Sequence, residues 1–288
     1  MQITFGIVWG LLAMFGWGIA DFFVAKAVKK ATIFQVFFWS QSLALLIVPL
    51  LFLFFFKSEP VSWFSIVIIM LCGALNIIAY LALYKGFQVG KVAIVSPIAA
   101  SWVMVAVMLS LLFLGEQLSP AQGIGLIIGV TGIILTSFKL SDFYSIQMDS
   151  LAQGVTYGFI HMLTTGIQFF LLDSLVTGLH WFLPTMLMRI TMFFYLLPYA
   201  YLTKKSLKFP TQIVLPIILI GFLEMMAILS YGYGISKNDT AFVAPIAAAF
   251  PMITVILARI FFKEKIENNQ KLGITAILIS LILLSLQV

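Results

Sequence analysis

Three ionisable side chains, His161, Arg189 and Glu224, lie inside long apolar stretches of the chain. A charge in the hydrocarbon region of a membrane is costly and usually marks a substrate or ion pathway. Arg189 and Glu224 fall at nearly the same depth of two consecutive antiparallel stretches, given the 1.5 Å rise per residue of a helix. We therefore predict that they pair. Arg189 is suited to hold a carboxylate, and Glu224 an amine or a proton.

Each of these residues also has a purely structural interpretation. The Arg189–Glu224 pair could simply join two helices. If Glu224 instead serves coupling, its protonation would follow the opening of the site to water, because desolvation favours a neutral carboxyl and a nearby arginine favours a charged one. His161 either belongs to a polar side of its helix with Thr164, Thr165 and Gln168 or bonds a backbone carbonyl, and the sequence leaves both open.

The composition is that of a membrane protein. Of 288 residues, 62% are hydrophobic and 9% charged, and the mean hydropathy of +1.15 leaves too few polar groups to cover a water-soluble surface. Stretches long enough to cross the hydrocarbon core are predicted at about 5–27, 33–56, 64–86, 92–114, 120–138, 151–173, 181–203, 212–236, 240–262 and 270–287.

The chain is a tandem duplication with a constant offset of 148 residues. Val95-Ser-Pro97-Ile98-Ala99-Ala100 recurs as Val243-Ala-Pro245-Ile246-Ala247-Ala248. The same offset relates glycines along the whole length, in the pairs Gly6 and Gly154, Gly10 and Gly158, Gly73 and Gly221, Gly86 and Gly234, and Gly125 and Gly273. Residues 1–140 and 149–288 thus form two copies. Five spans per copy would make the second copy enter from the opposite side. We predict an all-α integral membrane protein with ten transmembrane helices in two inverted repeats.

The offset of 148 residues also allows the polar positions of the two copies to be compared. Arg189 corresponds to Gln41, and Glu224 to Asn76. Polarity is therefore kept at matching depth in both copies, near the expected pseudo-twofold axis, where inverted-repeat transporters bind their substrates. Near the basic end of the helices, Asp21 and Lys85 are a candidate gating pair, although an interfacial pair or a snorkelling lysine explains them equally well.

Several of these residues carry a resemblance to a known family. Pro97 and Pro245 open the fourth and ninth predicted helices, Glu116 and Glu264 close them, and the fifth is rich in glycine at Gly123, Gly125, Gly129 and Gly132. In this the chain resembles the EamA-type members of the drug/metabolite transporter superfamily. One departure is that the arginine often found in the second helix of each copy occurs here only as Arg189, with Gln41 in the first copy.

The resemblance implies a secondary transporter working by alternating access, whose relatives move amino acids, sugars, nucleotide-sugars, drugs and other metabolites. It also implies that aromatic residues of helices 1, 3, 4 and 6 surround the cavity, here Trp17, Tyr80, Trp102 and Tyr157. We expect a small amphoteric metabolite, an amino acid or a related compound, as the substrate. Three alternatives remain open: a lipid-carrier flippase of the same superfamily, a membrane-embedded enzyme using Glu224 and His161 as acid and base, and a receptor or structural protein that does not transport.

Loop charges predict the orientation. Of the 16 basic residues, 13 lie in or beside the loops after helices 1, 3, 5, 7 and 9, and such loops face the cytoplasm. Both termini are then outside, in a multi-pass protein of a prokaryotic plasma membrane, although several relatives are drawn with cytoplasmic termini. The basic residues are spread over short loops, so nucleic acid is not an expected partner. The expected partners are the bilayer and a small-molecule substrate, without cofactor or metal, for a monomer or a homodimer joined through glycine-rich helices.

Two further expectations concern helix ends and bends. Glu116 and Glu264 lie beside the starts of the fifth and tenth helices, where a carboxylate offsets the helix dipole. Pro97 and Pro245 lie near helix starts, where proline costs little. Pro251, by contrast, falls in mid-helix and should bend the ninth helix. Its counterpart is Val103, so this bend is expected in one copy only.

Overall fold

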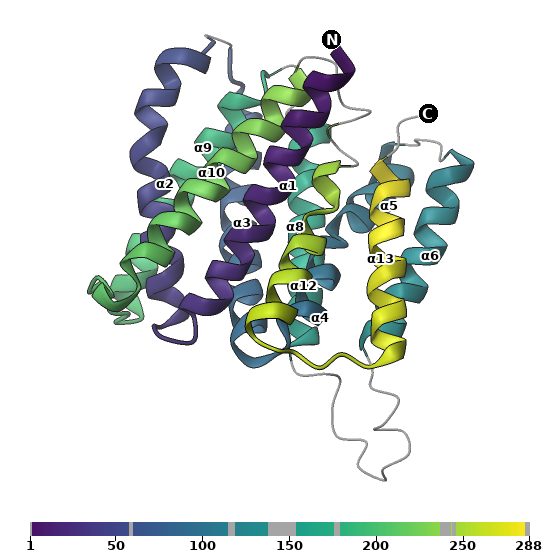
Figure 1. Ribbon diagram of the computed structural model, residues 1–288. Coiled ribbons are helices and arrows are strands. Elements are labelled where there is room, and N and C mark those ends of the chain that lie inside the picture. Colours follow the sequence, from purple (N-terminus) through teal and green to yellow (C-terminus); the bar gives the residue numbers. More distant parts are fainter. Residues whose placement is uncertain are drawn as a thin grey trace.

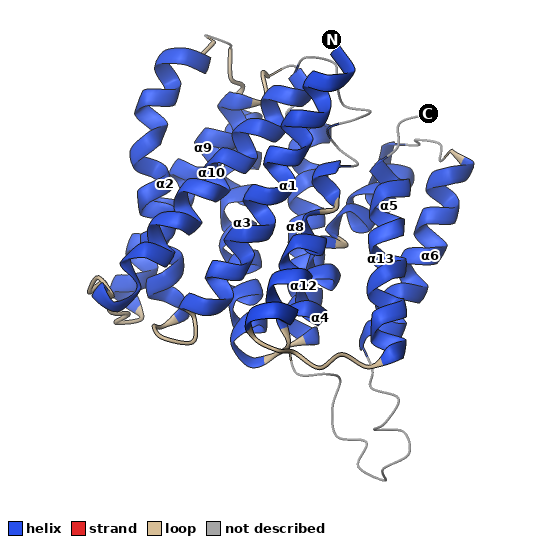
Figure 2. Cartoon of the chain, viewed as in Figure 1, coloured by secondary structure: helices blue, strands red, loops and turns tan. Residues whose placement is uncertain are grey.

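The computed structural model describes residues 2–57, 60–114, 119–137, 154–175, 179–236, 243 and 246–285. Figures 1 and 2 show helices packed side by side, with no strand in these ranges. The helices of the first copy are α1 (Gln2–Ala27), α2 (Ile33–Phe55), α3 (Trp63–Val89), α4 (Val92–Ala100), α5 (Trp102–Leu114) and α6 (Pro120–Ser137). Those of the second are α8 (Val155–Leu175), α9 (Phe182–Leu202), the short 3-10 helix η1 (Thr211–Ile213), α10 (Val214–Ser236), α12 (Phe250–Phe261) and α13 (Asn268–Ser285).

Seven helical segments of the described chain are long and apolar enough to cross a membrane, with α4 and α5 counted together and α10 together with η1. Three shorter apolar helices, Pro120–Thr136, Ile246–Phe261 and Asn268–Leu284, fall in the remaining predicted spans. Each predicted span therefore contains a helix, and the count of ten crossings stays a prediction.

Large apolar side chains cover the outside of the bundle. Those more than 70% exposed are Leu46, Leu53, Phe54, Trp63, Leu112, Phe113, Ile127, Phe194, Tyr201 and Leu202. A water-soluble monomer rarely exposes so much contiguous apolar surface, whereas lipid is a favourable solvent for it. The molecule is an integral, multi-pass membrane protein.

The helix contacts repeat with the offset of the sequence. α1 packs on α10 and α8 packs on α3, so the two copies exchange partners. Likewise α2 packs on α10 as α9 does on α3, while α6 packs on α13, its own counterpart, at one edge of the bundle (Figure 1). Such an exchange is the contact pattern of two units related by a twofold axis.

The duplicated glycines occupy matching close contacts. A methyl group added at Gly18 would lie 2.7 Å from the carbonyl oxygen of Phe250, and one at Gly166 would lie 2.8 Å from that of Trp102. Both the glycines and the carbonyls are 148 residues apart. Small residues let membrane helices approach closely, and here the same approach is built twice: Gly10 meets Val243 and Ile246 as Gly158 meets Val95 and Ile98, and Gly73 meets Met188 and Thr191 as Gly221 meets Ser40 and Leu43.

The bend expected in one copy occurs in both. The fourth span breaks at Ser101, with φ −70° and ψ 7°, and the ninth breaks at its counterpart Ala249, with φ −79° and ψ 4°. Pro251 lies just inside α12 rather than at the bend, and Pro97 lies inside α4 rather than at a helix start. In the first copy the Ser101 hydroxyl donates to the Pro97 carbonyl at 2.9 Å, a bond that competes with the helix ladder. The expected difference between the copies was therefore wrong. Pro245 lies outside the described residues.

Glu264 caps a helix, but not the predicted one. Its two carboxylate oxygens accept hydrogen bonds from the backbone N–H groups of Val92 and Ala93, each at 3.0 Å. These groups open α4, so the loop after α12 is joined to the other copy rather than to α13. The sequence could not reveal this, because the two segments are about 170 residues apart and meet only through the packing of α4 on α12. Glu116 lies outside the described residues.

Replacing Glu264 with glutamine is expected to lower the free energy of unfolding by about 1–2 kcal/mol, because an amide offers one acceptor oxygen to two N–H donors that have no helical partner. Reversible unfolding in mixed micelles measures the difference. The adjacent exposed Lys265, changed to glutamine, is the control and should be neutral. Equal stability of the Glu264 variant and the control would contradict the capping role.

Candidate substrate site

A buried polar triad lies where α2, α9 and α10 meet. Arg189 Nη1 donates to Gln41 Oε1 at 2.8 Å, and Gln41 Nε2 donates to Glu224 Oε2 at 2.7 Å. Arg189 Nη2 is 3.8 Å from Glu224 Oε1. The residues are 6%, 3% and 3% exposed in the order Arg189, Gln41, Glu224. The predicted contact between Arg189 and Glu224 is thus formed, and Gln41 bridges the two.

The triad lies at a point where equivalent residues of the two copies meet. Gln41 and Arg189 are counterparts, and they touch each other. Residues at equivalent positions of the two copies can touch each other only where the twofold axis that relates the copies passes between them. The same three helices, α2, α9 and α10, also share a hydrophobic cluster that includes the buried Ala44, Met186 and Met225.

Two polar atoms of the triad lack hydrogen-bond partners within the described chain: Arg189 Nε, a donor, and Glu224 Oε1, an acceptor. The 3.8 Å ionic contact of Glu224 Oε1 is too long for a hydrogen bond. Leaving buried charged groups short of partners is costly. A molecule that brings an acceptor to Arg189 and a donor to Glu224 would satisfy both atoms.

Tyrosines of α3 complete the surroundings of Glu224. Tyr80 interacts with Glu224 and stacks on Phe37 with ring centroids 5.7 Å apart. Tyr84, fully buried, meets Phe37 edge to face at the same centroid distance. Of the predicted aromatic residues, Tyr80 is the one whose contacts place it at the triad.

Asn76 does not join the triad. Its Nδ2 donates to Gln168 Oε1 of α8 at 3.1 Å, and Gln168 Nε2 contacts the Met188 sulfur at 3.4 Å. Asn76 has only a short side chain, whereas Glu224 meets Gln41 from the equivalent position of α10. Asn76 of the first copy therefore forms a separate amide pair with Gln168 of the second copy.

His161 takes the structural alternative. Its Nδ1 lies 3.0 Å from the Ala79 carbonyl oxygen and its Nε2 lies 3.4 Å from the Thr165 hydroxyl. The ring also meets Tyr80 edge to face. The Nδ1 contact joins α8 to α3, whereas the Nε2 contact lies within α8. Both ring nitrogens thus have partners, and His161 supports the position of Tyr80.

The structure does not bring Asp21 and Lys85 together. Asp21 accepts from the Ser96 hydroxyl at 3.2 Å, and Lys85 donates to Gln88 at 3.1 Å, whose amide continues to the Val28 carbonyl. Asp21 faces α4, while Lys85 faces the end of α1. Ser96 was missed from the sequence, although a signal existed: Ser96 is a polar exception within the repeated segment, where the second copy has Ala244.

The remaining predicted aromatics are used in helix packing. Trp17 packs with Tyr231 and Phe250, at centroid distances of 5.5 Å and 5.9 Å. Trp102 stacks on Phe169 at 4.1 Å, and the Cβ atom of Tyr157 would lie 3.3 Å from a methyl group added at Gly86. These residues line the seams between α1, α5, α8 and α10.

An apolar cavity of about 400 Å³ lies between α1, α2 and α10, lined by Trp9, Leu12, Phe55, Met226, Leu229, Ser230 and Tyr233. Ser230 follows Glu224 by six residues on α10, a rise of about 9 Å. The cavity lies toward the end of α10 that is remote from the basic loops.

Comparison with known proteins agrees with this architecture. The model of the EamA-like transporter family matches the chain twice, at residues 4–138 and 152–286. An uncharacterized protein of Methanocaldococcus jannaschii is 31% identical over 139 residues, which are 46% of this chain and 96% of that protein. A crystal structure of another protein, 14% identical, superposes with a TM-score of 0.64 over 96% of this chain and 95% of that chain, and shows the fold alone. With the family model matched along both copies, the chain belongs to the EamA-like transporter family.

Proposed function

We propose that this protein is a secondary transporter that moves a small amphoteric metabolite, an amino acid or a related compound, across the membrane by alternating access. The observation that carries the proposal is the buried triad, in which Arg189 Nε and Glu224 Oε1 lack hydrogen-bond partners in the described chain. A carboxylate suits the arginine and an ammonium suits the glutamate. Tyr80 supplies an aromatic wall on one side.

Alternating access rests on ten transmembrane spans arranged as two inverted five-helix repeats. The exchanged helix contacts and the matching glycines support this arrangement, as do the breaks at Ser101 and Ala249, because discontinuous helices at the repeat interface are typical of such carriers. Two copies in opposite orientation provide outward-open and inward-open states of similar energy. The loop charges favour an orientation with both termini outside the plasma membrane.

Coupling to protons is the second part of the proposal, with Glu224 as the carrier of the proton. The charged or titratable groups that interact with it are Arg189, Tyr80, Tyr84 and Asp21. Water entering the site would change how strongly these groups stabilise the carboxylate. Protonation would then follow the open side of the carrier.

Two steps test the function. A thermal-shift screen of metabolites on purified protein identifies a ligand, and counterflow of that labelled ligand in proteoliposomes measures exchange. We expect exchange without chemical change, whereas a membrane enzyme would alter the solute and a lipid flippase would move only lipid-linked molecules. Glu224→Gln should transport more slowly or lose the pH dependence of transport. A wild-type rate with an unchanged pH profile would refute the coupling role.

A further inference from the structure

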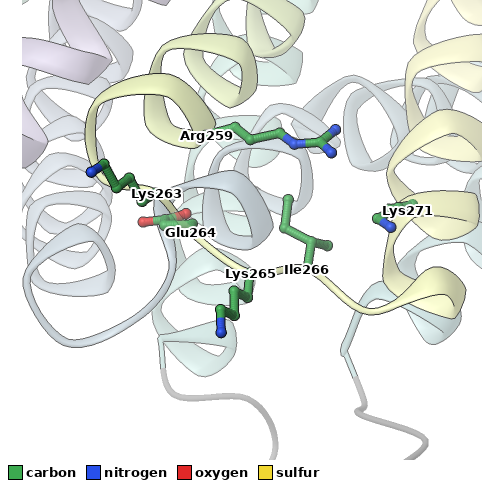
Figure 3. Close-up of a pocket in the computed structure, with 6 residues that line it drawn as sticks. All are labelled: Arg259, Lys263, Glu264, Lys265, Ile266 and Lys271. Atoms are coloured by element: carbon green, nitrogen blue, oxygen red, sulfur yellow. The ribbon is translucent and has the colours of Figure 1, made fainter.

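A second pocket, of about 370 Å³, opens on the basic face of the molecule, at the loop between α12 and α13. Figure 3 shows its lining: the cationic side chains of Arg259, Lys263, Lys265 and Lys271 around Ile266, with Glu264 beside them. Arg259 lies in the last turn of α12, Lys271 lies in the first turn of α13, and the two other lysines lie on the loop. Residues of α12, of the loop and of α13 thus contribute four cations to the lining, with the Lys263 and Lys265 ammonium groups pointing away from Arg259 in Figure 3.

The single carboxylate in the lining is already used. Both oxygens of Glu264 accept backbone N–H groups at the start of α4, so Glu264 forms no ion pair with the four cations in the described chain. Lys91 adds a fifth basic group at the edge, through its bond to the Lys265 carbonyl. The N-terminus of α13, which itself attracts anions, faces the same loop. The pocket carries a net positive charge with room for an anion.

The backbone at Lys263 shows that one of these charges is kept at a conformational cost. Lys263 follows the last residues of α12 with φ +52°, a left-handed conformation that glycine adopts most easily. Its counterpart in the first copy is Gly115, the residue expected at such a position. A lysine at this position strains the backbone more than a glycine would, but it adds a cation beside the pocket.

Exposed apolar side chains continue from the pocket along both helices. Ile256, Ile260 and Phe261 of α12 are 49%, 61% and 64% exposed, and Leu272 of α13 is 66% exposed. Both helices pack on α4. A ligand with an anionic head and an apolar tail therefore meets matching chemistry at both ends: cations at the membrane face and hydrocarbon next to them.

We infer that this pocket binds the phosphate group of an anionic phospholipid from the leaflet on the basic side of the membrane. Arg259 offers paired N–H donors to the phosphate oxygens and the lysines supply point charges. The acyl chains lie along the apolar faces of α12 and α13. This site is separate from the buried triad and does not depend on the substrate of the carrier.

The test compares two triple variants on the same basic face. Arg259→Gln/Lys263→Gly/Lys265→Gln removes three cations of the pocket, whereas Lys204→Gly/Lys205→Gln/Lys208→Gln removes three exposed cations elsewhere. The control is matched in charge and backbone, because Lys204 has φ +51°. Lipid binding to detergent-purified protein is measured by native mass spectrometry and by thermal shift, with phosphatidylglycerol, phosphatidylcholine and inorganic phosphate as probes.

We expect phosphatidylglycerol to stabilise the wild type more than phosphatidylcholine does, and the pocket variant to bind it about 10- to 100-fold more weakly. The control variant should keep wild-type affinity. An equal loss in both variants would overturn the site in favour of a general effect of the basic face. Stabilisation by inorganic phosphate without any effect of phosphatidylglycerol would overturn the lipid as the ligand.

Discussion

Changing Arg189 to glutamine is expected to abolish transport and to lower the free energy of unfolding by about 3–5 kcal/mol, because the change leaves a buried glutamate without its counter-charge. Glu224 is 3% exposed, and Gln41 alone would remain to bond it. Glu224→Asn should destabilise for the converse reason, since it leaves the arginine unpaired. Equilibrium unfolding in mixed micelles and ligand counterflow measure the two effects.

The repeat supplies the matched control for this experiment. Arg189→Gln/Glu224→Asn gives the second copy the residues of the first, Gln41 and Asn76. Replacing both members of a buried ion pair is often nearly neutral, so the double variant should recover most of the stability and none of the transport. A double variant that still transports would refute the substrate role of the pair. Single variants as stable as the wild type would refute its burial as a charged pair.

Gly18→Ala and Gly166→Ala are expected to destabilise the protein by similar amounts, about 1–3 kcal/mol each. At both positions the new methyl group would meet a backbone carbonyl, at 2.7 Å from Phe250 and 2.8 Å from Trp102, and a backbone atom cannot rotate away. Gly123→Ala is the control, because nothing lies within 4 Å of its added methyl group, and helix propensity favours alanine by up to about 1 kcal/mol.

The informative outcome of this series is the comparison between the copies. Similar losses of stability at positions 18 and 166 would show that the two equivalent helix contacts also contribute equal free energies. A loss of stability at only one of them would show that the two equivalent helix contacts contribute unequally to the free energy of unfolding. Thermal unfolding of the three variants side by side is sufficient, since the control reports any general effect of the added methyl group.

The sequence predicted the duplicated architecture and the centre of the candidate site, because both depend on spacings along the chain that can be read without coordinates. The offset of 148 identified matching glycines along the two copies, and the polar counterparts Gln41 and Arg189 marked the position where the copies meet. The depth of Glu224 along its stretch was enough to predict its contact with Arg189. These inferences needed only helix rise, repeat spacing and the cost of charge in hydrocarbon.

The sequence failed where partners are chosen by direction around a helix. In a membrane, lipid-facing and buried residues are both apolar, so periodicity does not show which way Asn76 or Asp21 points. Asn76 turned to Gln168 and Asp21 to Ser96, although depth alone allowed other partners. The sequence does not show the breaks at Ser101 and Ala249, because neither position holds a proline or a glycine that would mark a kink.

The meeting of Gln41 with Arg189 has a consequence for how such a centre can arise. The relative in Methanocaldococcus jannaschii matches about half of this chain over almost its whole length. If a single-copy ancestor assembled as a symmetric dimer, the residue at this position would have faced itself, and an arginine there would have been repelled by its twin. Joining two copies in one polypeptide frees each to mutate alone. Once the two copies can differ in sequence, arginine can face glutamine across the axis, which gives a charged, asymmetric centre in an otherwise symmetric frame.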